Sequence, residues 1–138
     1  MDSLSPEHRS EIMARVRGRD TRPELLVRSL THRLGYRFRL AGGGLPCRPD
    51  LVFASRRKVV LVHGCFWHSH NACPNARVPK SRRAFWAGKL SANKARDRRN
   101  LGRLTRMGWS YLVIWECELA SLESVAGKII DFLDSRET

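Results

Sequence analysis

The sequence predicts an α/β fold, a three-layer sandwich in which a central mixed β-sheet is flanked by helices. Two short apolar runs, residues 50 to 53 and 58 to 62, are typical of buried strands. Helical periodicity precedes them at residues 21 to 34 and follows them at residues 81 to 107. The chain has 138 residues and 42% hydrophobic content, which is enough for one hydrophobic core and too little for two separate ones. We therefore expect a single domain over residues 1 to 138.

The N-terminal third predicts two helices and a strand. A cap and proline at Ser5-Pro6 begin a small basic helix within residues 1 to 18. Residues 21 to 24 (TRPE) match a capping box and begin a second helix that ends at Gly35. Its apolar residues recur at helical spacing: Leu25, Leu26, Leu30 and Leu34. Residues 36 to 40 alternate bulky and basic side chains like a half-exposed strand, and a glycine loop follows at residues 42 to 44.

The remaining elements alternate between sheet and helix. A short polar turn separates the strands at residues 50 to 53 and 58 to 62, so they are expected to be antiparallel neighbours. The long helix at residues 81 to 107 is expected to break near Gly88. A strand at residues 111 to 115 and a last helix at residues 122 to 133 complete the domain.

The charge predicts a polyanionic partner. The chain has 26 Lys and Arg against 13 Asp and Glu, a formal net charge of +13. Residues 77 to 106 hold eleven bases and one acid, whereas residues 116 to 138 hold six acids and two bases. A solvated helix face is the ordinary interpretation of a charge run, but this imbalance favours phosphate contact.

No membrane association is expected from the sequence. No apolar run approaches the roughly 20 residues of a spanning helix, and the polar start Met1-Asp2-Ser3 lacks a signal-peptide core. We therefore expect a soluble, cytoplasmic protein.

Three thiols and an imidazole have the spacing of a zinc site. Cys65, His70 and Cys73 form C-x4-H-x2-C, and Cys117 follows a strand that could return it to the same end of the sheet. Free buried cysteines with a surface histidine are the alternative. The fourth cysteine, Cys47, lies in a Gly/Pro loop and needs no role beyond that of a small apolar filler.

An acid and two histidines suggest a second centre. Asp50 opens an apolar strand, where an ionised carboxylate is costly unless a cation such as Mg²⁺ or several donors hold it. A strand-opening Asp in a turn is equally common. His63 and His68 flank it, and each alone is more often structural, but together the three form a plausible acid/base and metal centre.

Several other residues have two interpretations each. Glu24 either supports that metal or only caps its helix, which is the stronger sequence signal. Asp97, the one acid of the basic helix, either pairs with a neighbouring Arg or orients a catalytic histidine. The pairs Phe66-Trp67 and Phe85-Trp86 are usually core residues, but exposed rings beside a basic surface can wedge between DNA bases.

Together these residues resemble the very short patch repair (Vsr) DNA mismatch endonucleases, a divergent branch of the restriction-endonuclease-like superfamily that nicks DNA beside T:G mismatches. The matching motifs follow the family's order over nearly the whole chain: residues 19 to 21 (RDT), 45 to 50 (LPCRPD), 63 to 68 (HGCFWH), 85 to 86 (FW), 97 to 99 (DRR) and 113 to 117 (VIWEC). HGCFWH is specific, whereas RPD or WEC alone is weak. Val62 stands where Thr can occur, Cys47 where Gly is expected, and the His70 to Cys73 spacing is one residue longer.

The resemblance implies a role for each site residue. Asp50 and the backbone carbonyl of Val62 would bind catalytic Mg²⁺, and His68 would be the general base. His63, Asp97 and Glu24 would support that centre. Structural Zn²⁺ would take Cys65, His70, Cys73 and Cys117.

The resemblance also implies the partner, double-stranded DNA with a T:G mismatch, nicked 5′ of the T by a monomer. The expected DNA contacts are Phe66, Trp67, Trp86, Lys89 and Asn93, with Met13 and Val16 of the N-terminal helix in the minor groove. Accessory mismatch-repair proteins are further partners that the resemblance allows.

Two rival hypotheses stay open on sequence. A non-catalytic, zinc-stabilised DNA-binding module would use the basic helix and the rings, with Asp50 structural. A restriction endonuclease would cut both strands of matched DNA, although no clear E-x-K follows Asp50.

Overall fold

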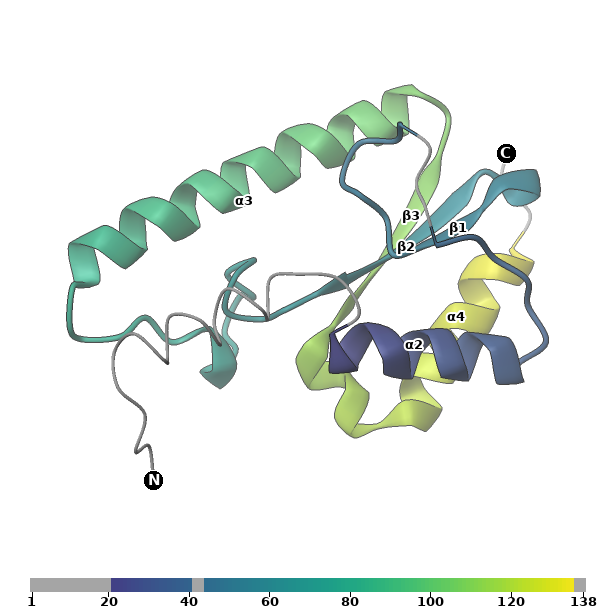
Figure 1. Ribbon diagram of the computed structural model, residues 1–138, viewed down its shortest axis with the longest axis horizontal. Helices are drawn as coiled ribbons and strands as arrows, with labels where there is room; N and C mark the ends of the chain where they lie inside the picture. Colours follow the sequence, from purple (N-terminus) through teal and green to yellow (C-terminus); the bar gives the residue numbers. More distant parts are fainter. Residues whose placement is uncertain (1–20, 41–43, 136–138) are drawn as a thin grey trace.

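A computed structural model describes residues 21–40 and 44–135, and these form a mixed three-stranded sheet with helices packed against it (Figure 1). The elements are α2 (Arg22–Arg33), β1 (Leu51–Phe53), β2 (Lys58–His63), α3 (Arg83–Arg106), β3 (Ser110–Trp115) and α4 (Leu122–Asp134), with short 3-10 helices at η1 (Ala54–Arg56), η2 (Pro74–Ala76) and η3 (Glu116–Ala120). The α/β class predicted from the sequence is confirmed.

The sheet order β1-β2-β3 brings two strand ends to one edge. β1 and β2 are antiparallel with Leu51 opposite Val60, as predicted from their short connection. β2 and β3 are parallel because α3 crosses between them, and His63 pairs with Trp115 at their carboxyl ends. The chain segments that follow both strands therefore begin side by side.

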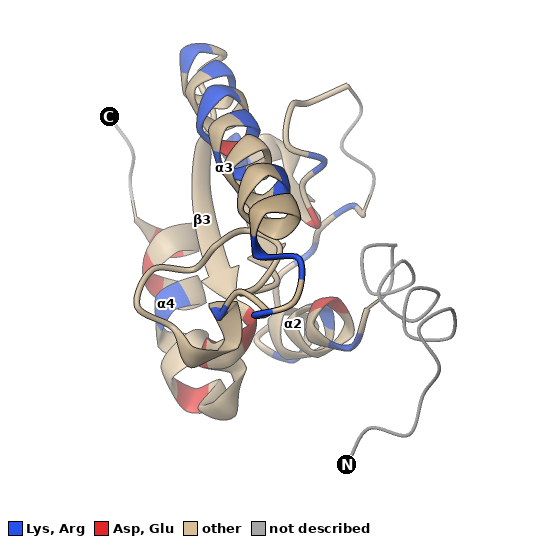
Figure 2. Ribbon diagram, turned by 90° about the vertical axis from the view of Figure 1, so that its left-hand side faces the viewer, with Lys and Arg blue, Asp and Glu red and all other residues tan. Residues whose placement is uncertain are grey.

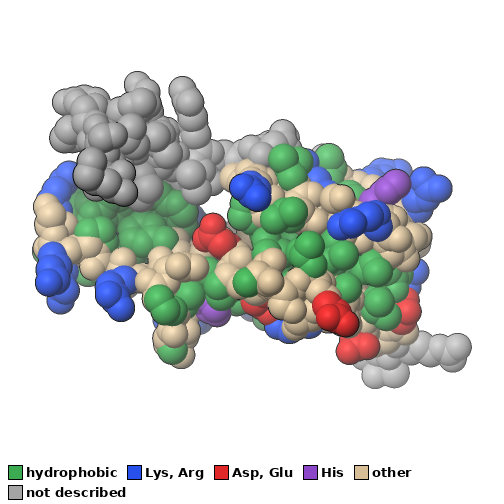
Figure 3. Space-filling model, turned by 90° about the horizontal axis from the view of Figure 1, so that it is seen from below, with side chains coloured by type: hydrophobic (Ala, Val, Ile, Leu, Met, Phe, Trp, Pro, Cys, Tyr) green, Lys and Arg blue, Asp and Glu red, His purple; other side chains and the backbone are tan. Residues whose placement is uncertain are grey.

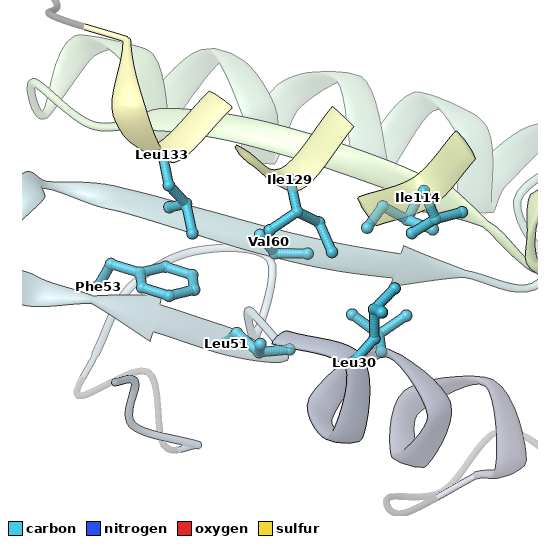
Figure 4. Packing of buried hydrophobic residues seen from close by; sticks show 9 residues of the cluster. Leu30, Leu51, Phe53, Val60, Ile114, Ile129 and Leu133 are labelled. Carbon is cyan, nitrogen blue, oxygen red and sulfur yellow. The ribbon is translucent and has the colours of Figure 1, made fainter. Parts of the chain in front are cut away.

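Helices α2 and α4 pack on one face of the sheet. The core there includes Leu30 of α2, Leu51 of β1, Val60 of β2, Ile114 of β3 and Ile129 of α4 (Figure 4). Each such side chain stabilises the fold by about 1.5 to 3 kcal/mol through burial. This cluster fixes the positions of β1 and β2.

The opposite face of the sheet is covered by α3. Val52 and Val59, which alternate with the residues of the first core, pack with Leu104 of α3. The described chain thus has helices on both faces of its sheet. The N-terminal part of α3 extends beyond the sheet, alongside the segment that follows β2 (Figure 1).

Helix α2 begins with the capping box that the sequence predicted. The Thr21 hydroxyl donates to Oε2 of Glu24 (2.7 Å), and the Thr21 amide donates to the same oxygen (3.4 Å). The buried side is shifted from the expected leucine stripe, because Val27 is fully buried while Leu25 is 49% exposed. Of the expected stripe, Leu30 belongs to the core and Leu34 packs against it.

Helix α3 runs unbroken through Gly88, so the predicted break is wrong. One glycine costs a helix about 1 kcal/mol, which a helix of 24 residues absorbs. Lys and Arg line α3 along its length, with the one acidic residue among them, whereas acidic residues gather around α4 (Figure 2). The basic helix α3 and the acidic residues around α4 therefore lie in different layers of the fold.

The prediction of a strand at residues 36 to 40 is also wrong. This segment forms only an isolated bridge, in which the Arg39 amide donates to the Val52 carbonyl (2.9 Å) and the Val52 amide donates to the Arg39 carbonyl (2.8 Å). Tyr36 instead donates to Asp134 at the end of α4 (2.9 Å). The helix expected within residues 1 to 18 lies outside the described residues, as does most of the glycine loop. Among the described helices, none has the length and apolarity required to cross a bilayer.

Candidate active site and metal centre

Two histidines and an aspartate meet beyond the end of β2. His63, the last residue of the strand, stacks on His68 with ring centroids 3.8 Å apart and planes 5° apart. Nδ1 of His68 lies 2.6 Å from Oδ2 of Asp97 on α3. The structure therefore decides between the two partners considered for Asp97, since this acid contacts a histidine.

The two imidazoles differ in environment. Burial, followed by the neighbouring His68, lowers the pKa of His63 to about 4, so its ring is neutral near pH 7. His68 is less buried, with about a quarter of its side chain exposed. A carboxylate at Nδ1 favours the proton on that nitrogen and leaves Nε2 as an acceptor. His68 is thus the imidazole with a nitrogen suited to take a proton.

Asp50 is held at the edge of β2 by a backbone amide. Its Oδ2 accepts a hydrogen bond from the Val62 amide (2.6 Å). The amide and carbonyl of one strand residue point to the same side, so the Val62 carbonyl is directed toward the edge where Asp50 lies. Both oxygens expected to bind Mg²⁺ are therefore on one side of the strand.

A second carboxyl crowds Asp50. Burial raises the pKa of Asp50 to about 7; the Val62 amide opposes this rise, and the neighbouring carboxyl of Glu24 adds to it. Glu24 caps α2 as predicted and also lies close to Asp50, where it is placed to support a metal ion. Two adjacent carboxyls in a half-buried position are suited to a hard divalent cation.

Arg28 lies with Glu24 and Asp50, and it was not predicted from the sequence as part of the site. Its guanidinium lies 3.5 Å from Oε1 of Glu24, one helical turn along α2, and its charge lowers the pKa of Asp50. The i to i+4 spacing after Glu24 was the available signal.

The carboxylate pair and the histidine group adjoin through the backbone. Val62 donates to Asp50, and the next residue, His63, stacks on His68. Two consecutive residues at the end of β2 therefore contact the two groups, Val62 through its backbone and His63 through its ring.

The four expected zinc ligands come together. Ligand atoms of Cys65, His70, Cys73 and Cys117 all lie within 4.8 Å of one another. Sγ of Cys117 is 3.4 Å from Nδ1 of His70. Tetrahedral Zn²⁺ with bonds of about 2.0 to 2.3 Å places its ligands about 3.3 to 3.8 Å apart, so this set fits the ion with small shifts.

Two observations bear on the cysteines. Burial raises the pKa of the Cys65 thiol to about 12, so a metal that binds there must displace a strongly held proton. Cys47 lies outside the ligand group and packs against the cluster of Val52, Val59 and Leu104, as a small apolar filler would. Its φ of 75° lies in the left-handed region that favours glycine.

The aromatic residues form one group next to the basic helix. The Trp86 ring centroid lies 5.4 Å from that of Phe66, 5.9 Å from that of Trp67 and 5.2 Å from that of Phe85. Phe85 is 47% exposed and the other three rings are half-buried. Seen from below, hydrophobic side chains gather between Lys and Arg side chains at the end of the molecule where α3 begins (Figure 3).

The other expected DNA contacts have different surroundings. Asn93 is buried, and its amide group donates to the carbonyl of Trp67 (3.4 Å), which holds the loop bearing that ring. Lys89 is half-exposed on α3. Met13 and Val16 lie outside the described residues.

A histidine in contact with a carboxylate, next to paired acids and beside a basic helix, is suited to hydrolysis of a phosphodiester backbone. The family model of the DNA mismatch endonuclease Vsr matches residues 1–74 of this chain. The chain therefore belongs to the Vsr family of DNA mismatch endonucleases and is a DNA endonuclease, a hydrolase. The non-catalytic alternative is wrong.

Three relatives are similar over most of their length. The type II nicking enzyme V.XorIIP of Xanthomonas oryzae pv. oryzae is 50% identical over 96% of this chain and 97% of its own. The DNA mismatch endonuclease Vsr of Escherichia coli is 40% identical, over 88% and 78% respectively. The type II nicking enzyme V.NmeAIP of Neisseria meningitidis is 36% identical, over 86% and 84%.

Proposed function

We propose that this endonuclease nicks one strand of duplex DNA on the 5′ side of the T in a T:G mismatch, depends on Mg²⁺, and so initiates very short patch mismatch repair. The observation that carries the proposal is the contact between His68 and Asp97, close to the end of β2 where Val62 binds Asp50. The names of the relatives support it, because one relative is a nicking enzyme and another is a DNA mismatch endonuclease.

The residues around Asp50 fit a magnesium ion. Asp50, the Val62 carbonyl and the nearby Glu24 supply hard oxygen ligands. Burial, with the neighbouring Glu24 carboxyl, raises the pKa of Asp50, so a cation bound there would offset the cost of ionising this carboxyl. When bound, Mg²⁺ supplies positive charge against the charge that develops on the phosphate oxygens.

The protein's own residues then account for proton transfer. Nε2 of His68 takes a proton from the attacking water, and Asp97 stabilises the imidazolium that forms. His63 holds the plane of His68 by stacking on it. The water oxygen bonds to phosphorus as the bond to the 3′ oxygen breaks, leaving a 5′-phosphate and, once protonated, a 3′-hydroxyl.

The Cys/His group fits a structural zinc ion. Its three sulfurs and one nitrogen form a closed set, with no ligand position left for a substrate. Cys65, His70 and Cys73 lie in the segment that also bears Phe66, Trp67 and His68. A metal there would stiffen the loop that presents both the rings and the general base.

Mismatch preference follows from the cost of inserting rings. A T:G wobble pair is weakly stacked, so rings such as Phe66, Trp67 and Trp86 separate it at less cost than a matched pair. The basic side chains of α3, including Lys89, would hold the phosphates. Met13 and Val16 would contact the minor groove from the N-terminal segment.

The domain itself is proposed to be restriction-endonuclease-like. A mixed sheet with β2 and β3 parallel, helices on both faces and the site at a strand end supports this assignment. Residues 1 to 138 would form one endonuclease domain that acts as a monomer.

The test uses synthetic duplexes with a T:G mismatch and the two matched pairs, each strand labelled separately, with and without Mg²⁺. We expect one nick, in the T strand of the mismatched duplex, only with Mg²⁺. Cleavage of both strands of matched DNA would support the restriction-enzyme alternative instead, and cleavage without divalent metal would reject the proposed metal dependence.

A further inference from the structure

Trp115 lies between the two clusters of the site and contacts both. Its ring stacks on the expected zinc ligand His70, with centroids 4.1 Å apart and planes 9° apart. It meets the ring of His63 edge to face, at 5.2 Å and 80°. Neither the zinc proposal nor the proton-transfer proposal uses this residue.

The backbone of Trp115 is fixed from two sides. As the last residue of β3 it pairs with His63 in the parallel ladder. Its amide donates to Oε1 of Glu118 (2.9 Å), and Glu118 is in turn paired with Lys128 of α4. The ring therefore has a rigid base from which to act on its neighbours.

The orientation of His63 depends on ring packing. In the described part of the chain, its Nδ1 is buried and makes no hydrogen bond. Its ring is instead held between Trp115 and the face of His68, 3.8 Å away. A hydrogen bond that would otherwise fix the plane of a site histidine is replaced here by aromatic contacts.

We propose that Trp115 is a positioning residue that sets the plane of His63 and, both through it and by its own edge-to-face contact at 6.4 Å, the plane of the general base His68. The contacts form a continuous series of rings, His70 to Trp115 to His63 to His68, which ends at Asp97. This inference rests on the proposed role of His68. Its consequence is that the metal cluster affects the rate of nicking as well as the stability of the fold.

The test compares Trp115→Leu, which removes the ring, with Trp115→Phe, which keeps one. Trp115 is half-buried, so both variants should fold. We expect the Leu variant to keep the zinc content of the wild type and to bind DNA within about 2-fold. Its single-turnover nicking rate at saturating DNA should fall about 10-fold or more, because small misplacements of a catalytic group are costly. The Phe variant should recover most of that rate.

A second readout needs neither DNA nor Mg²⁺. In protein labelled with ¹⁵N at histidine, the ring signals of both His63 and His68 should shift in Trp115→Leu and shift less in Trp115→Phe. This arm stays informative even if the wild type fails to nick T:G duplexes, so the two proposals are tested separately.

Two outcomes would overturn the inference. One is a Leu variant that nicks at the wild-type rate with unchanged His68 signals. The other is a rate loss that merely follows loss of zinc, which would make Trp115 a structural residue. Should the Leu variant not fold, Trp115→Met, whose flexible side chain refills the site, takes its place with the same expectations.

Discussion

Nδ1 of His68 and Oδ2 of Asp97 lie 2.6 Å apart, although the two residues are 29 positions apart in the sequence. His68 belongs to the segment after β2, and Asp97 lies near the middle of α3, the helix that carries eight of the 26 Lys and Arg residues of the chain. The contact joins the proposed proton acceptor to the helix proposed to bind the DNA backbone. A shift of α3 relative to the sheet would therefore also move the carboxylate that contacts His68.

This contact predicts a graded loss of nicking. His68→Ala removes the proton acceptor and should slow single-turnover nicking about 100-fold or more. Asp97→Asn keeps the side-chain shape but loses the charge that stabilises the imidazolium, and should cost about 10- to 100-fold. Asp131→Asn, at an exposed acid of α4, is the control and should leave the rate unchanged. Full activity in His68→Ala would assign the general base to another residue.

The cysteine cluster predicts that metal and stability are lost together. Purified protein should contain about one zinc per chain, and Cys73→Ser should lower both the zinc content and the melting temperature, because metal binding contributes folding free energy. Cys47→Ser, outside the cluster, should leave the zinc content unchanged. A folded, active sample without zinc in metal analysis would contradict the site.

The Cys/His group shows how much of a site can be predicted from the sequence. The spacing of Cys65, His70 and Cys73 predicted a local group, and Cys117 joined it because β2 and β3 are parallel neighbours whose ends share an edge. The inference needed only strand order. The capping box at Thr21 and the turn between β1 and β2 were equally local, and both are present.

The His68–Asp97 contact could not be predicted in the same way. It depends on how α3 is rotated and placed over the sheet, and the arginines around Asp97 in the sequence offered equally good local partners. The segment at residues 36 to 40 failed for a related reason. Its alternating pattern suits a strand, but contacts such as that of Tyr36 with Asp134 decide its path. The left-handed backbone of Cys47, by contrast, agrees with the glycine that the family resemblance led us to expect at this position.

The basic surface of α3 predicts steeply salt-dependent DNA binding. The logarithm of the association constant should fall with the logarithm of salt concentration by about 0.9 per phosphate contacted. Replacing the exposed Arg98 and Arg99 by Gln should reduce this slope by up to about 2. A binding titration at several salt concentrations measures it. Affinity that is independent of salt would contradict phosphate contact by this helix.

The aromatic group predicts a loss of discrimination rather than of binding. Phe66→Ala, Trp67→Ala and Trp86→Ala should each weaken binding to the T:G duplex more than to the matched duplex, because only the mismatch is opened at low cost. Tyr111→Ala, at an exposed ring outside the group, is the control. Equal losses on both duplexes would mean that these rings serve the fold alone.

The raised pKa of Asp50 predicts opposite effects of Asp50→Asn on catalysis and on stability. Asn loses the charge proposed to bind Mg²⁺, so nicking should be abolished while DNA binding is retained or improved.

The effect on stability depends on pH in a definite direction. The folded-state pKa of about 7 lies above the unfolded value of about 3.9, so the folded protein holds the proton more tightly. The wild type without Mg²⁺ should therefore lose stability as the pH rises from about 4 to about 7. Asp50→Asn has no such proton, so it should melt at a higher temperature than the wild type at pH 8 and at a similar temperature at pH 4. Each 1 kcal/mol gained would raise the melting temperature by about 3 to 5 °C in a domain of this size.

The melts are measured in buffers without Mg²⁺ and without chelator, so that any bound zinc stays in place. Asp131→Asn is the matched control. A variant that melts below the wild type at pH 8 would show that the Asp50 carboxylate stabilises the metal-free fold, and nicking at the wild-type rate would remove Asp50 from the active site.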